Sequence, residues 1–150
     1  MPDPAGDAGL LTPPYVDVVR VSIEDDGSRA RVVVDVAGAL PQQLPADEVA
    51  GVGVDLYVGD RPSSDYQVFA DGSPDGWFAY LYAEGDLVRY PGSFALGGSR
   101  MVFELPWNTV GDRAVARFSA FYDWSKDAVP VNRVGEDHAP ATGTAPLRRP

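Results

Sequence analysis

Short segments in which apolar and polar residues alternate, separated by turn residues, constrain the fold of this chain more than any other feature. In RARVVVDV (29–36), alanine or valine occupies every second position, with mostly arginine or aspartate between them. Such alternation puts one face of a strand on the core and the other in water, and segments of this kind recur about every 8–12 residues. The pattern predicts an all-β, antiparallel β-sandwich of about eight strands, of jelly-roll or immunoglobulin-like type. The predicted strands are 15–24, 29–36, 51–59, 65–70, 76–82, 86–90, 100–107 and 114–123.

The predicted sandwich domain covers residues 15–128. The preceding stretch, 1–14, lacks the basic start and apolar core of a signal peptide, and it is interpreted as a flexible N-terminal linker. After residue 128 proline, glycine and arginine dominate, so 129–150 is predicted to be a loosely ordered tail. Asp26-Gly27 is a dipeptide typical of hairpin turns and is predicted to join the first two strands.

The charge and cysteine content exclude several classes of function. A net charge of −10 repels nucleic acid and anionic lipid, so neither is expected as a partner. The chain has no cysteine, which rules out disulfides, thiol catalysis and cysteine-ligated metals. It also has no apolar run of about 18 residues, so membrane insertion is not expected. We expect a mature or excised domain outside the cytoplasm, with a cytoplasmic location left open; the sequence predicts no oligomeric state.

The stretch DGSPDG (71–76) raises the question of a cation-binding loop. Its alternating oxygen-bearing side chains match the first half of an EF-hand calcium loop, but position twelve is Tyr82 instead of glutamate, so an EF-hand is rejected. A looser calcium site would combine this stretch with the acidic residues of the preceding loop. The alternative is a plain β-turn with proline second and glycine fourth. The candidate metal ligands are Asp60, Asp65, Asp71 and Asp75.

A second group of acidic residues follows the last predicted strand and continues into the tail. It could hold a structural calcium, or it could be the solvated surface of an acidic protein, which is the favoured interpretation. Its members are Asp123, Asp127, Glu136 and Asp137.

Several short motifs resemble a known group of sandwiches. The strand VGVDLYVGD (52–60) is followed by DYQVFA (65–70), then by an aromatic strand, by MVFELPWNTVG (101–111) and by EDHAP (136–140). This order resembles family-9-like carbohydrate-binding modules and DOMON-like domains over residues 15–140. The resemblance implies a β-sandwich that serves as an accessory module of secreted hydrolases, as a sugar binder or as a haem-carrying electron-transfer domain.

The aromatic strand GWFAYLY (76–82) suggests a sugar-binding face. Alternation places Trp77 on one side and Tyr80 and Tyr82 on the other. Exposed rings can stack on sugar rings while neighbouring polar side chains bond the hydroxyl groups. The alternative is that both sides are buried, for example under a loop at 91–99, and that the aromatics are core residues. The candidate ligand-binding residues are Tyr57, Trp77, Tyr80, Tyr82, Asp55 and Arg89.

Haem and enzyme chemistry are weaker hypotheses. The resemblance to DOMON domains implies Met101 and His138 as haem ligands, but Met101 falls in register with core residues. The chain has a single histidine and no nucleophile motif, and Asp55 and Glu104 could form a hydrolytic carboxylate pair.

The favoured hypothesis is a non-catalytic module that binds carbohydrate, with an optional structural Ca²⁺ and no required cofactor. The first alternative is a structural or interaction domain that binds a neighbouring protein domain. The second is a small glycan-active hydrolase that uses the Asp55 and Glu104 pair.

Overall fold

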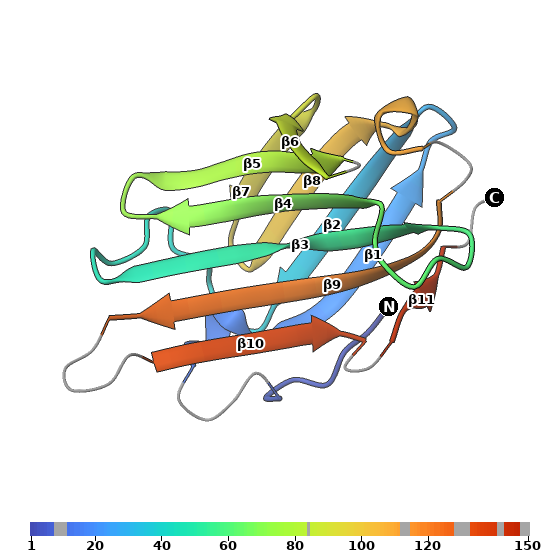
Figure 1. Ribbon diagram of the computed structural model, residues 1–150. Helices are drawn as coiled ribbons and strands as arrows, with labels where there is room; N and C mark the ends of the chain where they lie inside the picture. The colour runs from blue at the N-terminus through green and yellow to red at the C-terminus, as the bar shows by residue number, and fades with distance from the viewer. Residues whose placement is uncertain (8–11, 84, 112–114, 128–132, 141–142, 148–150) are drawn as a thin grey trace.

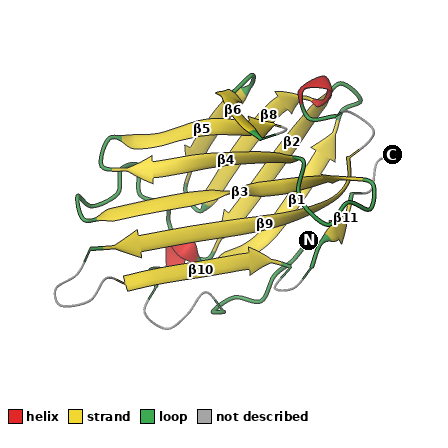
Figure 2. Cartoon of the chain, viewed as in Figure 1, coloured by secondary structure: helices red, strands yellow, loops and turns green. Residues whose placement is uncertain are grey.

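The chain folds into two antiparallel sheets that pack face to face (Figures 1 and 2). The small sheet has the strand order β1–β2–β8–β7, and the large sheet has the order β10–β9–β3–β4–β5–β6, with β11 also paired to β9. In Figure 1 the strands of the small sheet run obliquely behind those of the large sheet. The computed structural model describes residues 1–7, 12–83, 85–111, 115–127, 133–140 and 143–147.

The two longest strands, β3 with 11 residues and β9 with 12, lie side by side in the large sheet. The small sheet consists of β1 Val18–Asp25, β2 Arg29–Val36, β7 Ser93–Gly97 and β8 Arg100–Pro106. The large sheet consists of β3 Glu48–Val58, β4 Tyr66–Ser73, β5 Gly76–Ala83, β6 Asp86–Arg89, β9 Val115–Lys126, β10 Arg133–Ala139 and β11 Ala145–Pro146. The helical elements among the described residues are two 3₁₀ turns, η1 Pro14–Val16 and η2 Trp107–Thr109. None of the described residues belongs to a helix long and apolar enough to cross a membrane.

The predicted all-β antiparallel sandwich is confirmed. Each of the eight predicted segments contains a strand, and three further strands, β7, β10 and β11, bring the total in the described residues to eleven. The segment 91–99, suggested as a covering loop, instead contains β7 at the edge of the small sheet.

The core lies between the sheets and is built from every second residue of their strands. Val52, Val54 and Leu56 of β3 are buried and face Met101 and Phe103 of the small sheet across one continuous apolar cluster. Because β-branched and aromatic side chains suit a pleated surface that is buried on one side, the alternation in the sequence translates directly into this packing.

One buried polar group sits at the start of β3. Glu48 accepts hydrogen bonds from the Tyr15 hydroxyl, from Trp124 Nε1 at 3.1 Å and from Lys126 Nζ at 2.9 Å. Burial opposes its ionisation, but these three donors outweigh burial and hold the pKa of Glu48 below its ordinary value. The carboxylate therefore fastens β3 to β9 and to the segment that precedes β1.

Two tight turns follow the sequence closely. At the β1–β2 hairpin, Gly27 has φ +90° and Asp26 Oδ1 accepts the backbone N–H groups of Ser28 and Arg29, as expected for the predicted Asp-Gly turn. At the β4–β5 hairpin, Ser73 pairs with Gly76 and the Asp75 N–H donates to Ser73 Oγ at 3.2 Å. The stretch DGSPDG thus ends β4 and forms a two-residue turn, in agreement with the turn alternative.

Both ends of the chain differ from the predicted linker and tail. Residue Pro2 forms a β-bridge with Arg20, and Thr12 occupies the space that a side chain at Gly135 would need, 2.0 Å from that Cβ position. Strands β10 and β11 lie beyond the predicted limit at residue 128. Strand β10 lacks apolar alternation because its inward positions, Gly135 and Asp137, face the N-terminal segment instead of the apolar core.

Candidate functional site

The outer face of the large sheet, which points away from the small sheet, carries exposed aromatic rings among polar side chains. On β5 the rings of Phe78 and Tyr82 are 51% and 42% exposed, and Tyr80 lies between them on the same side. The same side of β3 and β4 carries Asp55, Gln67, Phe69 and Asp71, because these residues pair across the strands with one another or with the β5 rings.

A line of residues crosses the middle of this face. The glycine at its centre is required by sterics, since a Cβ on Gly53 would lie 2.2 Å from the Val68 carbonyl oxygen. Beside it the Phe69 and Tyr80 rings pack with their centroids 5.5 Å apart and their planes tilted by 31°. In strand order from β10 to β6 the line runs His138, Phe121, Gly53, Phe69, Tyr80 and Arg89.

An acidic hollow of about 480 Å³ lies on this face over Gly51. Its walls include three carboxylates, those of Asp71, Asp123 and Glu136, which the strand register places in one row. Gly51 has no side chain to fill the hollow, and Asp71 Oδ1 lies 3.6 Å from the position that a Cβ on Gly51 would take. Burial raises the pKa of Asp71, and burial together with the charge of Glu136 raises the pKa of Asp123.

A second hollow, of about 620 Å³, lies on the far side of the central line, where Gln67, Tyr82 and Asp65 contribute to its walls. Gln67 Nε2 donates to Asp55 Oδ1 at 3.1 Å, which orients the amide. Burial raises the pKa of Asp55 although this hydrogen bond opposes the shift. An aromatic ring, an amide and a carboxylate thus line one recess, a combination that can bond a polyhydroxylated ligand.

Of the six predicted ligand-binding residues, all except Trp77 lie on one face of the sandwich. Asp55, Tyr57, Tyr80, Tyr82 and Arg89 all lie on the outer face of the large sheet. Within this group the ring of Tyr57 is already covered by the Arg117 guanidinium, 5.3 Å from its centroid.

The prediction that Trp77 belongs to the ligand-binding face is wrong, because its side chain points into the sandwich. Its Nε1 donates to the Pro41 carbonyl at 2.8 Å, and its ring packs edge-to-face against Tyr122. The alternation predicted for the aromatic strand is correct, and it excludes Trp77 from the face that carries Tyr80.

Sequence reasoning missed part of this face. The residues it missed are Gly51, Gly53, Gln67, Phe69, Phe78, Ser119 and Phe121. For β3 and β4 the sequence did carry a signal, because alternation holds along each strand. On β3 it puts Gly51 and Gly53 on the same side as Asp55, and on β4 it puts Phe69 and Asp71 on one side. For β9 the sequence carries no local signal, because the pairing of β9 with β3 depends on the topology of the whole sheet.

The four carboxylates predicted as a calcium site do not come together. Asp60 and Asp65 precede β4 and Asp75 follows it, and this eight-residue strand separates the two ends by about 26 Å. Asp65 instead forms an ion pair with Arg61. Asp71 lies on the outer face near the Asp75 end of the strand, so the predicted combination of the two loops is wrong.

The second acidic group is divided by the sheet. Asp123 and Glu136 pair across β9 and β10 on the outer face, whereas Asp137 is buried on the inner side and its Oδ2 accepts the Val18 N–H. Asp127 follows β9, and its N–H donates to the Asp47 carbonyl at 2.8 Å.

The haem hypothesis fails on geometry. Met101 is fully buried in the core from the small sheet, whereas His138 is exposed on the outer face of the large sheet. The two side chains lie on different sides of the large sheet and cannot ligate one iron.

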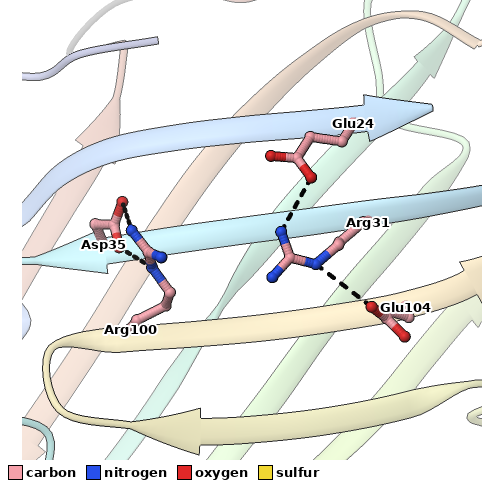
Figure 3. Close-up of polar contacts among 5 residues, drawn as sticks. All are labelled: Glu24, Arg31, Asp35, Arg100 and Glu104. Carbon is pink, nitrogen blue, oxygen red and sulfur yellow. Dashed lines mark hydrogen bonds and ion pairs between the residues drawn. The ribbon is translucent and has the colours of Figure 1, made fainter. Parts of the chain in front are cut away.

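The predicted hydrolytic pair also fails, because Asp55 and Glu104 lie on opposite outer faces of the sandwich. Figure 3 shows Glu104 on the small sheet, where it pairs with Arg31 at 3.4 Å, and Arg31 in turn pairs with Glu24 at 3.0 Å. Nearby, Arg100 Nε pairs with Asp35 at 2.6 Å. Ion pairs thus engage several of the charged side chains on the outer face of the small sheet.

No protein-family model, curated protein or solved structure gives a significant match to this chain. The assignment of function therefore depends on the geometry of the outer face of the large sheet.

Proposed function

We propose that the protein binds carbohydrate on the outer face of the large sheet. The observation that carries the proposal is the row of rings on β5, the exposed Phe78 and Tyr82 with the half-buried Tyr80 between them, beside the two hollows. Successive rings on one side of a strand lie about 6.7 Å apart, so they can stack on consecutive units of a glycan chain. The hollows place carboxylate and amide groups where the hydroxyl groups of those units would project.

The polar groups of this face are available to a ligand. Asp71, Asp123 and Glu136 form no ion pair with a lysine or arginine in the described part of the chain. All three are exposed, so their carboxylates can accept hydrogen bonds from a ligand, and sugar hydroxyls donate them. An uncharged polyol also avoids the repulsion that an anionic ligand would meet on a protein of net charge −10.

A neighbouring protein domain is the second candidate ligand. Strand β6 is an edge strand with all four residues exposed, and Leu87 adds apolar surface beside Tyr82, its partner on β5. Such an edge can pair with a strand from another chain. Carbohydrate is favoured because the rings and hollows extend from β5 to β10, far beyond this edge.

The test is affinity electrophoresis against a panel of soluble polysaccharides, followed by calorimetry with oligosaccharides of any polymer that retards the protein. Tyr82→Ala should weaken binding about tenfold, because loss of one stacked ring costs about 1.4 kcal/mol. Tyr82→Phe keeps the ring and should stay closer to the wild type.

Arginine variants supply the matched control. Arg89→Ala removes a charge beside Tyr80 and should weaken binding, whereas Arg31→Ala removes one from the outer face of the small sheet and should not. Unchanged mobility with every polysaccharide, or equal effects of the two arginine variants, would refute the proposal.

A further inference from the structure

Three carboxylates from distant parts of the sequence converge beside the N-terminal segment. One oxygen from each of Asp3, Asp7 and Asp137 lies within 4.8 Å of the other two. The arrangement is built by backbone contacts: the Asp3 N–H donates to the Val19 carbonyl at 2.9 Å, and Asp137 Oδ2 accepts the Val18 N–H. The segment before β1 is thereby laid alongside β1 and β10.

A fourth carboxylate lies next to the cluster and is buried without a full set of partners among the described residues. Asp17 is only 7% exposed; its Oδ2 accepts the Gly6 N–H at 2.7 Å, but its Oδ1 has no hydrogen-bond donor among the described residues. Asp3 Oδ2 is likewise buried and without a donor in the described residues. Buried carboxylate oxygens without a donor are costly, so their presence points to a missing positive partner.

The charges in the cluster are not balanced by the protein. Burial and the charges of Asp7, Asp137 and Asp17 raise the pKa of Asp3 to about 6, and burial is also the main cause of the raised pKa of Asp137. No lysine or arginine forms an ion pair with any of the four carboxylates in the part of the chain that is described. Asp17 Oδ2 accepts the N–H of Gly6, the neighbour of Asp7, so the Asp17 carboxylate lies next to the cluster.

We propose that Asp3, Asp7 and Asp137, with Asp17 beside them, bind one Ca²⁺ that fastens the N-terminal segment to β1 and β10. Ca²⁺ takes oxygen ligands at 2.3–2.6 Å, so oxygens on opposite sides of the ion lie up to about 5 Å apart, which matches the observed spacing. Mg²⁺ requires shorter bonds and near-octahedral geometry with several waters, and zinc sites use nitrogen or sulfur. The site lies apart from the proposed glycan-binding face and does not depend on it.

The test uses the full-length protein, stripped with EDTA and titrated with CaCl₂ or MgCl₂ by calorimetry and by thermal unfolding. We expect one Ca²⁺ per chain and a rise in Tm of about 5–10 °C at 100 times the Kd. Asp7→Asn, at an exposed ligand whose loss should leave the fold intact, should weaken Ca²⁺ binding at least tenfold, and Asp3→Asn should act in the same direction.

Two control variants locate the site. Asp86→Asn, at an exposed aspartate of β6, and Asp75→Asn, in the β4–β5 turn, should bind Ca²⁺ as the wild type does. Absence of binding heat and of a Tm shift at 10 mM Ca²⁺ (about 100 times a Kd of 10⁻⁴ M, the tight end of the range of extracellular modules) would overturn the proposal. So would unchanged binding in Asp7→Asn and Asp3→Asn, loss of binding in Asp75→Asn, or an equal Tm shift with Mg²⁺.

Discussion

Two glycines on the outer face of β3 should respond in opposite ways to replacement by alanine. Both lie on the same side of the same central strand, two residues apart, but their surroundings differ. A Cβ on Gly53 would lie 2.2 Å from the Val68 carbonyl oxygen and 2.6 Å from the Phe69 Cα, whereas a Cβ on Gly51 would meet only Asp71 Oδ1, at 3.6 Å.

The magnitudes follow from these contacts. In Gly53→Ala the clash is with backbone atoms of β4, so relief requires the two central strands to separate, and we expect a loss of about 3 kcal/mol or more in the free energy of unfolding. In Gly51→Ala the added methyl group makes an ordinary contact and the unfolded chain loses freedom, so a gain of about 0.4–1 kcal/mol is expected. For a chain of this length, Tm should fall by about 6–12 °C in the first variant and rise by a few degrees in the second.

Urea unfolding followed by tryptophan fluorescence measures both variants on the same scale. Equal midpoints for the two variants, or a destabilised Gly51→Ala, would refute the reasoning from Cβ contacts. The pair also bears on function, because Gly51→Ala adds a methyl group to the floor of the acidic hollow and should weaken glycan binding without loss of stability.

Two further predictions concern buried carboxylates. Glu48→Ala should lower the free energy of unfolding by about 3–5 kcal/mol, because it leaves buried donors without their shared acceptor. Asp47→Ala, at the exposed partner of Lys126, should lower it by less than about 1 kcal/mol. Similar urea midpoints for the two variants would contradict this. Asp55 has a raised pKa in the folded state, so its charge reduces stability as the pH rises above the ordinary aspartate range. Asp55→Asn should therefore raise Tm at pH 7 but not at pH 3, and a gain that persists at pH 3 would exclude this cause.

The sequence was sufficient to predict the fold class and most strands, because a period of two is a local property that survives folding. It also placed Asp55, Tyr80 and Tyr82 correctly on solvent-facing sides of their strands. It could not indicate that Asp71 and Glu136 would share one hollow, because that depends on β9 lying between β3 and β10.

The ends of the chain were harder to predict for a different reason. Strand β10 has glycine and aspartate at inward positions, and these have meaning only once the N-terminal segment is packed against it. The carboxylates of Asp3, Asp7 and Asp137 therefore come together through tertiary contacts that no local sequence pattern predicts. The loop at 71–76, which does match a calcium motif locally, forms a turn.

Binding of a glycan to the outer face of the large sheet is tested most directly by an amide chemical-shift titration of ¹⁵N-labelled protein with an oligosaccharide selected by affinity electrophoresis. The account predicts that the largest shifts occur on β3, β4 and β5, at residues such as Asp55, Phe69 and Tyr80, with β1, β2, β7 and β8 little changed. Shifts confined to the small sheet, or no shift with any oligosaccharide of the panel, would contradict it.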